Sequence, residues 1–403
     1  MNRRTFLATT AGAGMAALGS KAARGGGSDG EKAVLHLPET LASPVTIAAI
    51  DVLKVGGNYF LRTRSADGAT GVAMANSRIA YLMGILRQRV IPYFVGKDAR
   101  DLERLVEGVY VHESNYKLGG LAFWNCVGWV EFSLFDLLGK VAGKGVADLL
   151  GGRVRDEIPV YLSSMRRDTT PEQEVAWLAK RLAETGADAV KLKVGGRMSG
   201  NRDAFPGRTD GLIPLARKTF GPKVAIYADA NGSYDAPHAI EVGRMLQEHG
   251  VAFFEEPCPW EELGETKRVS DALEMPVAGG EQDASLPRFR WMVNSRVVDI
   301  VQPDVNYHGG FIRTVQVARM AAAAGRVITP HSPAAGFRAI TMLQFAAATA
   351  NIGAHMEYTG APVRKETWCT PAVEISGGKV RVPAGPGLGL EIDPAYLAKA
   401  EKV

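Results

Sequence analysis

Seven polar side chains recur along residues 193–357 at nearly regular intervals. They are Lys193, Asp229, Glu255, Glu281, Asp304, His331 and Glu357. Four of the six intervals are 26 or 27 residues long, and each side chain ends or follows a short apolar run. A single charged residue at such a position is usually a solvated boundary. Seven in phase instead predict one site, built from successive repeats of a strand and a helix.

The three carboxylates Asp229, Glu255 and Glu281 end consecutive apolar runs, so their oxygens are expected to point at one place. Such a set suits a hard cation such as Mg²⁺ with positions left open for substrate oxygens. The alternative is a carboxylate cluster neutralised by Arg or Lys partners. Because no basic residue ends these three runs, the sequence favours the metal.

Lys191 and Lys193 flank Leu192 in an apolar run, so on a strand both side chains lie on the same face. Two neighbouring ammonium groups disfavour each other's charge, which lowers the pKa. We therefore expect one of these lysines to act as a base near neutral pH.

His331 and Asp304 end neighbouring runs further along the chain. A carboxylate that accepts a hydrogen bond from one imidazole nitrogen orients the ring and raises its basicity. The pair therefore predicts a second acid/base group, and a packing or capping histidine is the alternative. Of the other six histidines, only His308 is expected to touch substrate.

The elements that would hold these residues follow from the alternation of apolar runs and amphipathic segments between residues 155 and 370. Eight strands are predicted, at 158–162, 189–194, 224–228, 252–255, 277–281, 300–304, 327–331 and 354–357. Helices are predicted between them, at 171–185, 211–220, 236–249, 260–273, 285–293, 312–324 and 339–350. Eight such units in succession predict an α/β fold, a (β/α)₈ barrel of the TIM type.

Three further segments complete the predicted organisation. Residues 45–150 open with strand-like stretches and pass into helical periodicity at 99–111 and 123–141, which indicates an α+β capping domain. Residues 371–403 contain Gly, Pro and β-prone stretches and are expected to return to that domain. With 403 residues, the chain is long enough for a barrel and a smaller companion.

Residues 1–30 resemble a twin-arginine export signal with a flexible leader. Arg3 and Arg4 precede a weakly apolar stretch at 8–19, which is too short to span a bilayer as a helix. The segment predicts a periplasmic or other extracytoplasmic location; the alternative is an untargeted tail. Cys126, Cys258 and Cys369 show no CxxC spacing, which argues against a disulfide framework or a zinc site.

The formal net charge of +4 says little about partners. Arg3, Arg4, Lys21 and Arg24 account for the whole excess and lie in the predicted leader. Without a basic run elsewhere, we expect neither nucleic acid nor an anionic membrane surface as a partner.

The order of motifs over residues 45–392 resembles the mandelate racemase branch of the mandelate racemase and muconate lactonizing enzymes in the enolase superfamily. The matching motifs are Lys191-x-Lys193, Ala228-Asp229-Ala230-Asn231, Glu255-Glu256-Pro257, Gly280-Glu281, Pro303-Asp304, His331 and Glu357. The resemblance implies a first domain that caps the barrel mouth, with a loop near residues 56–73 closing over the substrate. It also implies a symmetric homo-oligomer, as is common in the family.

The resemblance implies a role for each matched position. Asp229, Glu255 and Glu281 would bind Mg²⁺, and Asn231 would lie beside the metal. Lys193 would be the acid/base on one face of a small carboxylate substrate, and His331 with Asp304 the acid/base on the other. Lys191 would supply positive charge, and Glu357 would hydrogen-bond the substrate carboxylate or its enediolate.

These roles imply abstraction of the proton next to a carboxylate. We expect dehydration of a sugar acid to a 2-keto-3-deoxy acid, because the loop at 195–210 contains Arg197, Arg202 and Arg208, which could bind a polar chain. Tyr307 and His308 are bulkier than in many members and are expected at the substrate. A racemase, epimerase or cycloisomerase with the same residues is the alternative, and a periplasmic sugar-acid binding protein is the alternative of another class.

Overall fold

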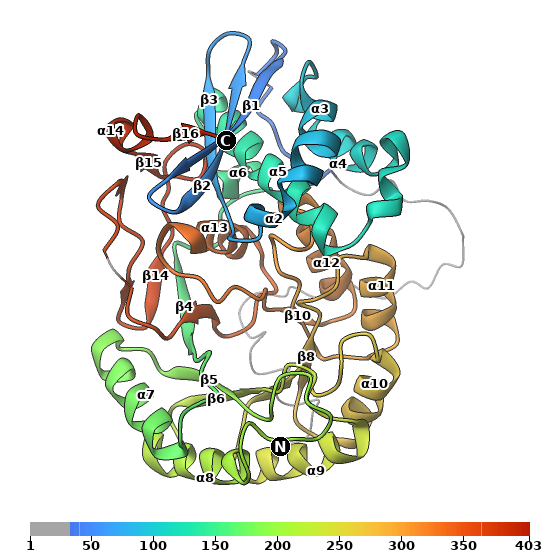
Figure 1. The fold of residues 1–403 in the computed structure, drawn as a ribbon, viewed down its shortest axis with the longest axis vertical. Helices are drawn as coiled ribbons and strands as arrows, with labels where there is room; N and C mark the ends of the chain where they lie inside the picture. The colour runs from blue at the N-terminus through green and yellow to red at the C-terminus, as the bar shows by residue number, and fades with distance from the viewer. Residues whose placement is uncertain (1–32, 40, 364) are drawn as a thin grey trace, which may run out of the picture.

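The computed structural model describes residues 33–39, 41–363 and 365–403, and the predicted leader at 1–30 lies outside them. Two parts are stacked along the long axis of the molecule (Figure 1). A smaller part with an antiparallel sheet and several helices lies at one end. A larger part, in which strands alternate with helices, lies below it.

The larger part contains the eight predicted strands, all paired in parallel. They are β4 (Glu157–Ser163), β5 (Ala189–Lys193), β6 (Ala225–Asp229), β7 (Phe253–Glu255), β8 (Val277–Gly279), β9 (Ile300–Val301), β10 (Val327–Ile328) and β11 (Met356–Thr359). The order is β10-β9-β8-β7-β6-β5-β4, with β11 beside β4. Within the described residues no ladder joins β10 to β11, and a single bridge from Ile328 to Ile352 lies between them. The α/β barrel is therefore not closed by continuous strand pairing.

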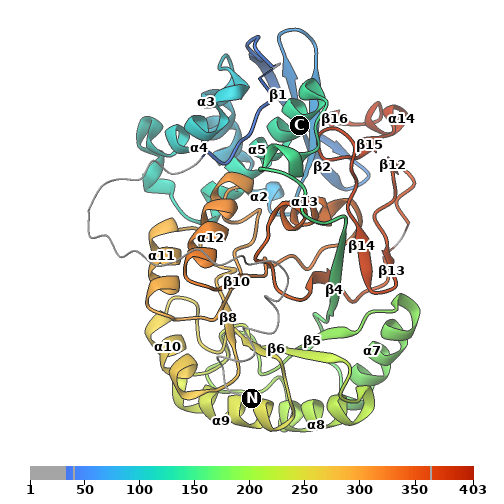
Figure 2. The same ribbon diagram turned by 180° about the vertical axis from the view of Figure 1, so that it is seen from behind.

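Seven helices alternate with these strands. Most of them form the outer wall of the larger part, as both views of the ribbon show (Figures 1 and 2). They are α7 (Pro171–Thr185), α8 (Arg208–Phe220), α9 (Ala236–Glu248), α10 (Leu263–Ala272), α11 (Leu286–Asn294), α12 (Phe311–Ala323) and α13 (Ile340–Ala348). Local sequence fixes the ends of α7. The Thr170 hydroxyl accepts from Gln173 N at the start, and Gly186, at φ 68°, ends the helix in the left-handed region.

The barrel interior follows the two-residue period of its strands. An apolar layer is formed by Tyr161, Ala189, Tyr227, Phe253, Ala278 and Ile300, in which the Tyr227 and Phe253 rings stack at 4.1 Å. Four polar residues each follow a member of this layer by two positions in the chain and are also buried: Lys191, Asp229, Glu255 and Gln302. A polar layer therefore lies directly on an apolar floor.

The smaller part is a sheet covered by helices. Its strands are β1 (Ile47–Val55), β2 (Asn58–Ser65) and β3 (Thr70–Ala75), and its α-helices are α2 (Ile79–Ile85), α3 (Ile91–Phe94), α4 (Leu102–Val111), α5 (Leu121–Ala142) and α6 (Val146–Leu149). Short turns of other helix types are η1 (Leu86–Val90), η2 (Ala99–Asp101) and η3 (His112–Leu118). Among the described residues α5 alone is long and apolar enough to cross a membrane, but 89% of that stretch is buried in the fold, as in a core helix.

The C-terminal residues contact both parts. They form β12 (Cys369–Thr370), β13 (Ile375–Ser376), β14 (Lys379–Arg381), β15 (Glu391–Ile392), α14 (Pro394–Leu397) and β16 (Glu401–Lys402). The short turn η4 (Gly336–Ala339) belongs to the barrel and lies directly before α13. β14 pairs with β4 of the barrel, whereas β16 pairs with β1 of the smaller part. The chain end accordingly lies beside the antiparallel sheet in Figure 2.

Candidate active site

One side of the polar layer, which we call the lysine wall, consists of Lys191, Lys193, Asp229 and Glu255 on β5, β6 and β7. Strand register places Lys193 beside Asp229 and Asp229 beside Glu255. Lys193 Nζ donates to Asp229 Oδ2. Lys191 Nζ lies 2.8 and 2.9 Å from the two oxygens of Glu255. The lysine wall is thus a compact set of two ammonium groups and two carboxylates.

This arrangement differs in two ways from the sequence argument. The sequence predicted no basic partners for the carboxylates, because no basic residue ends their own strands. Asp229 and Glu255 nevertheless pair with lysines, which come from strand β5. The lysine pair was also expected to lower its own pKa. Burial does lower the pKa of Lys191, but the carboxylates of Glu255 and Glu357 outweigh it and hold that pKa well above its usual value.

The opposite side, the histidine wall, consists of Asp304, Tyr307 and His331 beyond β9 and β10. His331 Nδ1 donates to Asp304 Oδ2 at 2.8 Å. The other oxygen, Asp304 Oδ1, accepts from the backbone N–H of Asn306 and Tyr307 at 2.7 and 3.1 Å. The carboxylate is therefore fixed by its own loop, and it leaves His331 Nε2 as the nitrogen that faces the centre.

Charge around His331 favours the protonated imidazole. Its Nε2 lies 3.3 Å from Glu281 Oε2 and 3.9 Å from Glu357 Oε2. Burial lowers the pKa of His331, but these two carboxylates and the hydrogen bond that His331 donates to Asp304 raise it to about 10. In this arrangement His331 holds a proton and can give it away.

Glu357 lies between the two walls. Its Oε1 is 2.8 Å from Lys191 Nζ, and its Oε2 accepts from Ser332 N at 2.7 Å. Burial raises the pKa of Glu357, but Lys191 and His331 outweigh it, and the pKa is lowered. This residue therefore remains an anion that links the lysine wall to the histidine wall.

The carboxylates fit a divalent cation in chemistry, although not in their present spacing. Within the described ranges, no three His, Cys, Asp or Glu side chains are close enough together to hold an ion. Yet Glu281 Oε2 and Glu256 Oε1 are buried and have no hydrogen-bond partner among the residues that the structure describes. Burial, with the charges of its acidic neighbours, also raises the pKa of Glu255. A dication would relieve this crowding, and Asp229, Glu255 and Glu281 are the donors that face the centre.

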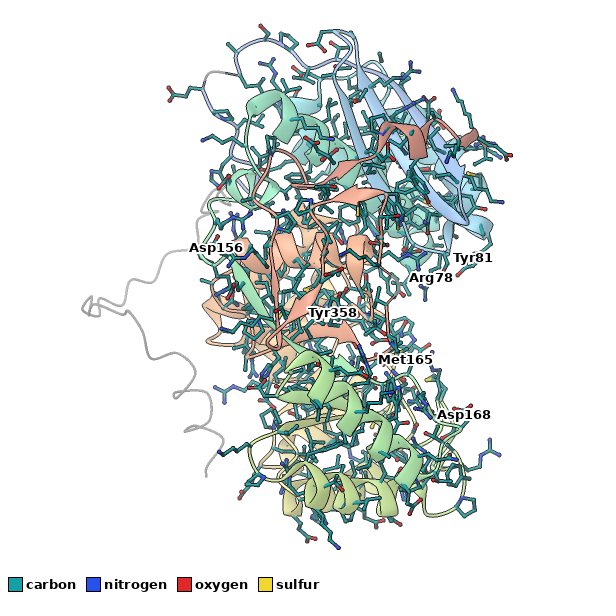
Figure 3. All side chains as sticks on the ribbon, turned by 90° about the vertical axis from the view of Figure 1, so that its left-hand side faces the viewer. Arg78, Tyr81, Asp156, Met165, Asp168 and Tyr358 are labelled. Carbon is teal, nitrogen blue, oxygen red and sulfur yellow. The ribbon has the colours of Figure 1, made fainter. Side chains whose placement is uncertain are left out.

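A cavity of about 840 Å³ opens between the smaller part, the histidine wall and the C-terminal segment. Its lining includes Asn76 and Ser77, which follow β3, and Trp368 near the C terminus. From the barrel it includes Tyr307 and Ser332. In Figure 3, Arg78 and Tyr81 lie at the edge of the smaller part that faces the barrel, whereas Met165 and Asp168 lie on the barrel side. The smaller part therefore contributes to the cavity directly.

The predicted substrate-binding residues do not all reach this cavity. Tyr307 lines it. Asn231 lies beside the lysine wall, where its Nδ2 donates to Asp229 Oδ2 at 3.1 Å, and Arg197 lies 3.4 Å from Asn231 Oδ1. His308 is a correction, because it is fully buried and packs edge-on against Phe289 at 4.9 Å. The turn after Asp304 directs neighbouring side chains to opposite sides, so Tyr307 and His308 cannot both face the substrate.

The arginines of the 195–210 loop also differ from expectation. Arg208 is buried and donates to the backbone carbonyls of Lys193 and Thr169 at 2.7 and 2.9 Å. Arg202 donates to Ser199 O within its own loop. Arg197 instead reaches Asn231, a predicted substrate-binding residue, at 3.4 Å. The guanidinium groups of Arg202 and Arg208 are used in backbone contacts, so the loop gives less support to a polar substrate than its composition indicated.

Two site residues were missed by the sequence argument. Gln302 donates to Glu255 Oε2 at 3.1 Å, and its position two residues before Asp304 on the same strand face is a signal that was available. Arg167 follows β4 and donates to Asn231 Oδ1 at 2.8 Å. Nothing in the spacing distinguishes Arg167 from Arg166 next to it.

The fold and this site define a barrel enzyme whose polar centre lies at the carboxyl ends of its strands. The profile of the enolase C-terminal domain-like family matches residues 174–396. The chain therefore belongs to that family, which confirms the resemblance to mandelate racemase and muconate lactonizing enzymes. It is an enzyme rather than a binding protein.

Relatives of known activity span most of the chain. D-galactarolactone cycloisomerase of Agrobacterium fabrum is 31% identical over 320 residues, which cover 76% of this chain and 82% of the relative. Arabinonate dehydratase of Saccharolobus solfataricus is 31% identical over 306 residues, which cover 75% and 78%. Both act on small carboxylates or their lactones.

Solved structures agree with the whole fold. A Roseobacter denitrificans protein proposed to be a racemase has a TM-score of 0.83 and 37% identity, covering 88% of this chain and 98% of its own. A mandelate racemase/muconate lactonizing protein from Paracoccus denitrificans, complexed with magnesium, has a TM-score of 0.80 and 26% identity, covering 89% and 99%.

Proposed function

We propose that this enzyme removes the α-proton of a sugar acid in a Mg²⁺-dependent reaction and expels the β-hydroxyl, giving a 2-keto-3-deoxy acid. The observation that carries the proposal is the presence of two different acid/base groups, Lys193 and His331, on opposite sides of one set of buried carboxylates. Proton removal and hydroxyl departure each need one such group.

Asp229, Glu255 and Glu281 would hold the Mg²⁺, which supplies positive charge beside the substrate carboxylate as the α-proton leaves. Lys193 Nζ, in its neutral form, takes the α-proton, and the electron pair moves into the carboxylate to give an enediolate. His331 Nε2 then donates its proton to the β-hydroxyl, which leaves as water. The product of this elimination is an enol, whose β-carbon takes up a proton while the enol hydroxyl loses one, and the β-carbon becomes the methylene carbon of the 2-keto-3-deoxy acid.

His331 suits the acid role better than the base role in this arrangement. Its Nε2 lies 3.9 Å from Glu357 Oε2, and a carboxylate at that place favours the protonated imidazole. Asp304 accepts from the Nδ1–H group, so the second proton of the imidazolium is on Nε2, the nitrogen that faces the centre. A residue that starts protonated can assist the departure of a hydroxyl.

A second candidate uses the same residues for racemisation or cycloisomerisation. The similarity to a galactarolactone cycloisomerase and to a protein proposed to be a racemase favours it. In racemisation His331 would return a proton to the α-carbon from the opposite face. Product chemistry, rather than the identity of the acid/base residues, separates the two candidates.

The test is incubation of the enzyme with Mg²⁺ and a panel of aldonic and aldaric acids in deuterated water, followed by proton NMR and a keto-acid assay. A 2-keto-3-deoxy product supports dehydration and identifies the substrate. Loss of the α-proton signal without a new product would replace dehydration by racemisation. If no acid in the panel reacts, dehydration of sugar acids is contradicted.

We also propose that the enzyme acts outside the cytoplasm, on the strength of the Arg3-Arg4 pair and the apolar stretch after it. Replacing both arginines by lysine should retain the protein in the cytoplasmic fraction. Equal export of the double variant and the parent would contradict a twin-arginine route.

A further inference from the structure

Arg78, in the smaller part, contacts Tyr307 of the histidine wall in two ways. Its Nη1 donates to the Tyr307 hydroxyl oxygen. Its guanidinium carbon also lies 4.2 Å from the centre of the Tyr307 ring, as in a cation–π contact. This contact therefore joins two residues that are 229 positions apart in the chain.

Both partners are held by their own surroundings. Arg78 N donates to Asn76 Oδ1 at 3.0 Å, and Asn76 Nδ2 donates to Asn125 Oδ1 on α5 at 2.8 Å. Tyr307 N donates to Asp304 Oδ1, and the Tyr307 ring lies 5.9 Å from the His331 ring. The contact thus connects the edge of the smaller part to the acid/base pair.

The chemistry of the pair sets the direction of the hydrogen bond. A guanidinium has donors and no acceptor, so the Tyr307 oxygen must accept. Its own hydrogen then remains for another group, and within the described part of the chain no acceptor is hydrogen-bonded to it. Tyr307 is 9% exposed and lines the cavity. Burial raises the pKa of this phenol above its usual value, so it keeps that hydrogen at neutral pH.

We propose that Tyr307 is a specificity-determining residue that donates a hydrogen bond to a hydroxyl of the substrate chain beyond the reacting carbons, and that Arg78 is its positioning residue. The ligand class that this geometry selects is a linear polyhydroxylated carboxylate rather than an acid with a hydrocarbon chain. The inference rests on the proposed function and deepens it, because it names the part of the substrate that the smaller part helps to recognise.

The matched probes are D-galactonate and 2-hydroxyhexanoate, which share an α-hydroxy carboxylate on a six-carbon chain and differ in the remaining hydroxyls. Affinities with Mg²⁺ present are measured by calorimetry for the parent, Tyr307→Phe, Arg78→Ala, Arg78→Lys and the Tyr307→Phe/Arg78→Ala double variant. The control is Tyr81→Phe, since Tyr81 is 71% exposed and lies three residues beyond Arg78.

For Tyr307→Phe we expect about 5- to 20-fold weaker binding of D-galactonate and unchanged binding of 2-hydroxyhexanoate, as for the loss of one buried hydrogen bond. Arg78→Ala should weaken D-galactonate binding in the same direction, and the double variant should match Tyr307→Phe instead of multiplying the losses. Arg78→Lys should recover part of the loss, since it restores a donor but not the planar stacking. Tyr81→Phe should change neither affinity.

Equal weakening for both probes, or multiplied losses in the double variant, would overturn the inference in favour of a purely structural contact. Turnover is recorded separately. If D-galactonate binds and responds to Tyr307→Phe but is not converted, the proposed reaction fails while the recognition role stands. If the parent binds neither probe, the assignment of this ligand class is wrong.

Discussion

The lysine wall and the histidine wall surround the same centre but are held in place differently. The lysine wall is built entirely from the barrel, where strand register sets Lys193, Asp229 and Glu255 side by side. The histidine wall belongs to a loop. Asp304 fixes His331 through a turn, and Tyr307 reaches Arg78 in the smaller part.

The smaller part supports the histidine wall at a second point. Glu131, buried on α5, accepts from the backbone N–H of Phe311 and Ile312 at 2.5 and 3.0 Å and so caps the start of α12. A Cβ on Gly128 of the same helix would lie 3.1 Å from Asn306 O. The comparison teaches that one acid/base group depends on the barrel alone, whereas the other depends on the contact between the two parts.

The largest effects are expected from removal of either acid/base group. Lys193→Ala and His331→Asn should each lower kcat by about 10²- to 10⁴-fold, the range for general acid–base catalysis. Steady-state assays on the substrate that the panel identifies provide the measurement. Full turnover in both variants would contradict the two-wall account.

Glu255→Gln removes one carboxylate from the predicted metal set and leaves Lys191 with one close partner fewer. We expect Mg²⁺ to bind roughly tenfold or more weakly, because an anionic ligand is replaced by a neutral one. Calorimetric titration with Mg²⁺ is the measurement. The control is Glu262→Gln, at an exposed position just before α10, which should bind Mg²⁺ as the parent does. If Glu255→Gln also bound Mg²⁺ with parental affinity, Glu255 would not be a metal ligand.

Asp304→Asn should impair only the histidine wall. The amide no longer favours the Nδ1–H tautomer of His331, and kcat should fall roughly 10- to 100-fold, as for loss of a carboxylate partner of a functional histidine. Binding of Mg²⁺ measured in parallel should stay at the parental value. A matching loss of Mg²⁺ affinity would mean that the two walls are not independent.

A further prediction leaves catalysis aside and concerns Glu131 and the pH dependence of stability. Burial raises the pKa of Glu131 from 4.5 to about 8, even though two backbone N–H groups oppose this. Between those values the folded state binds more protons at this site than the unfolded state, so stability falls as pH rises. Over that window the contribution is on the order of a few kcal/mol.

Glu131→Gln carries no titrating proton at this position. Denaturant titrations at pH 5 and pH 8 should therefore show a smaller fall in the free energy of unfolding for the variant than for the parent. An identical fall in both proteins would show that Glu131 does not titrate in this window.

Much of the barrel was predictable because its strands impose a period on the sequence. The spacing of Asp229, Glu255 and His331 reflects one strand and one helix each, and the structure brings these residues to one centre. The residues of the lysine wall follow strand register, which sequence expresses directly. The ion pairs between these lysines and carboxylates were not predicted, because the lysines are on β5 whereas Asp229 and Glu255 are on β6 and β7.

Loop geometry was less predictable. His308 and Tyr307 are adjacent, yet one packs on Phe289 and the other lines the cavity, because the turn held by Asp304 rotates them apart. Arg208 was expected at the substrate but donates to backbone carbonyls at the strand ends. No periodicity governs such positions, and the contact of Arg78 with Tyr307 depends on how the two parts pack.

The most direct test of the central claim follows the α-proton itself. The enzyme variants Lys193→Ala and His331→Asn are each incubated in deuterated water with Mg²⁺ and the two α-epimers of the acid that the parent converts. The account predicts that His331→Asn still exchanges the α-proton of the epimer that faces Lys193, while Lys193→Ala does not. Exchange of that epimer by Lys193→Ala at the parental rate would contradict the assignment of Lys193 as the base.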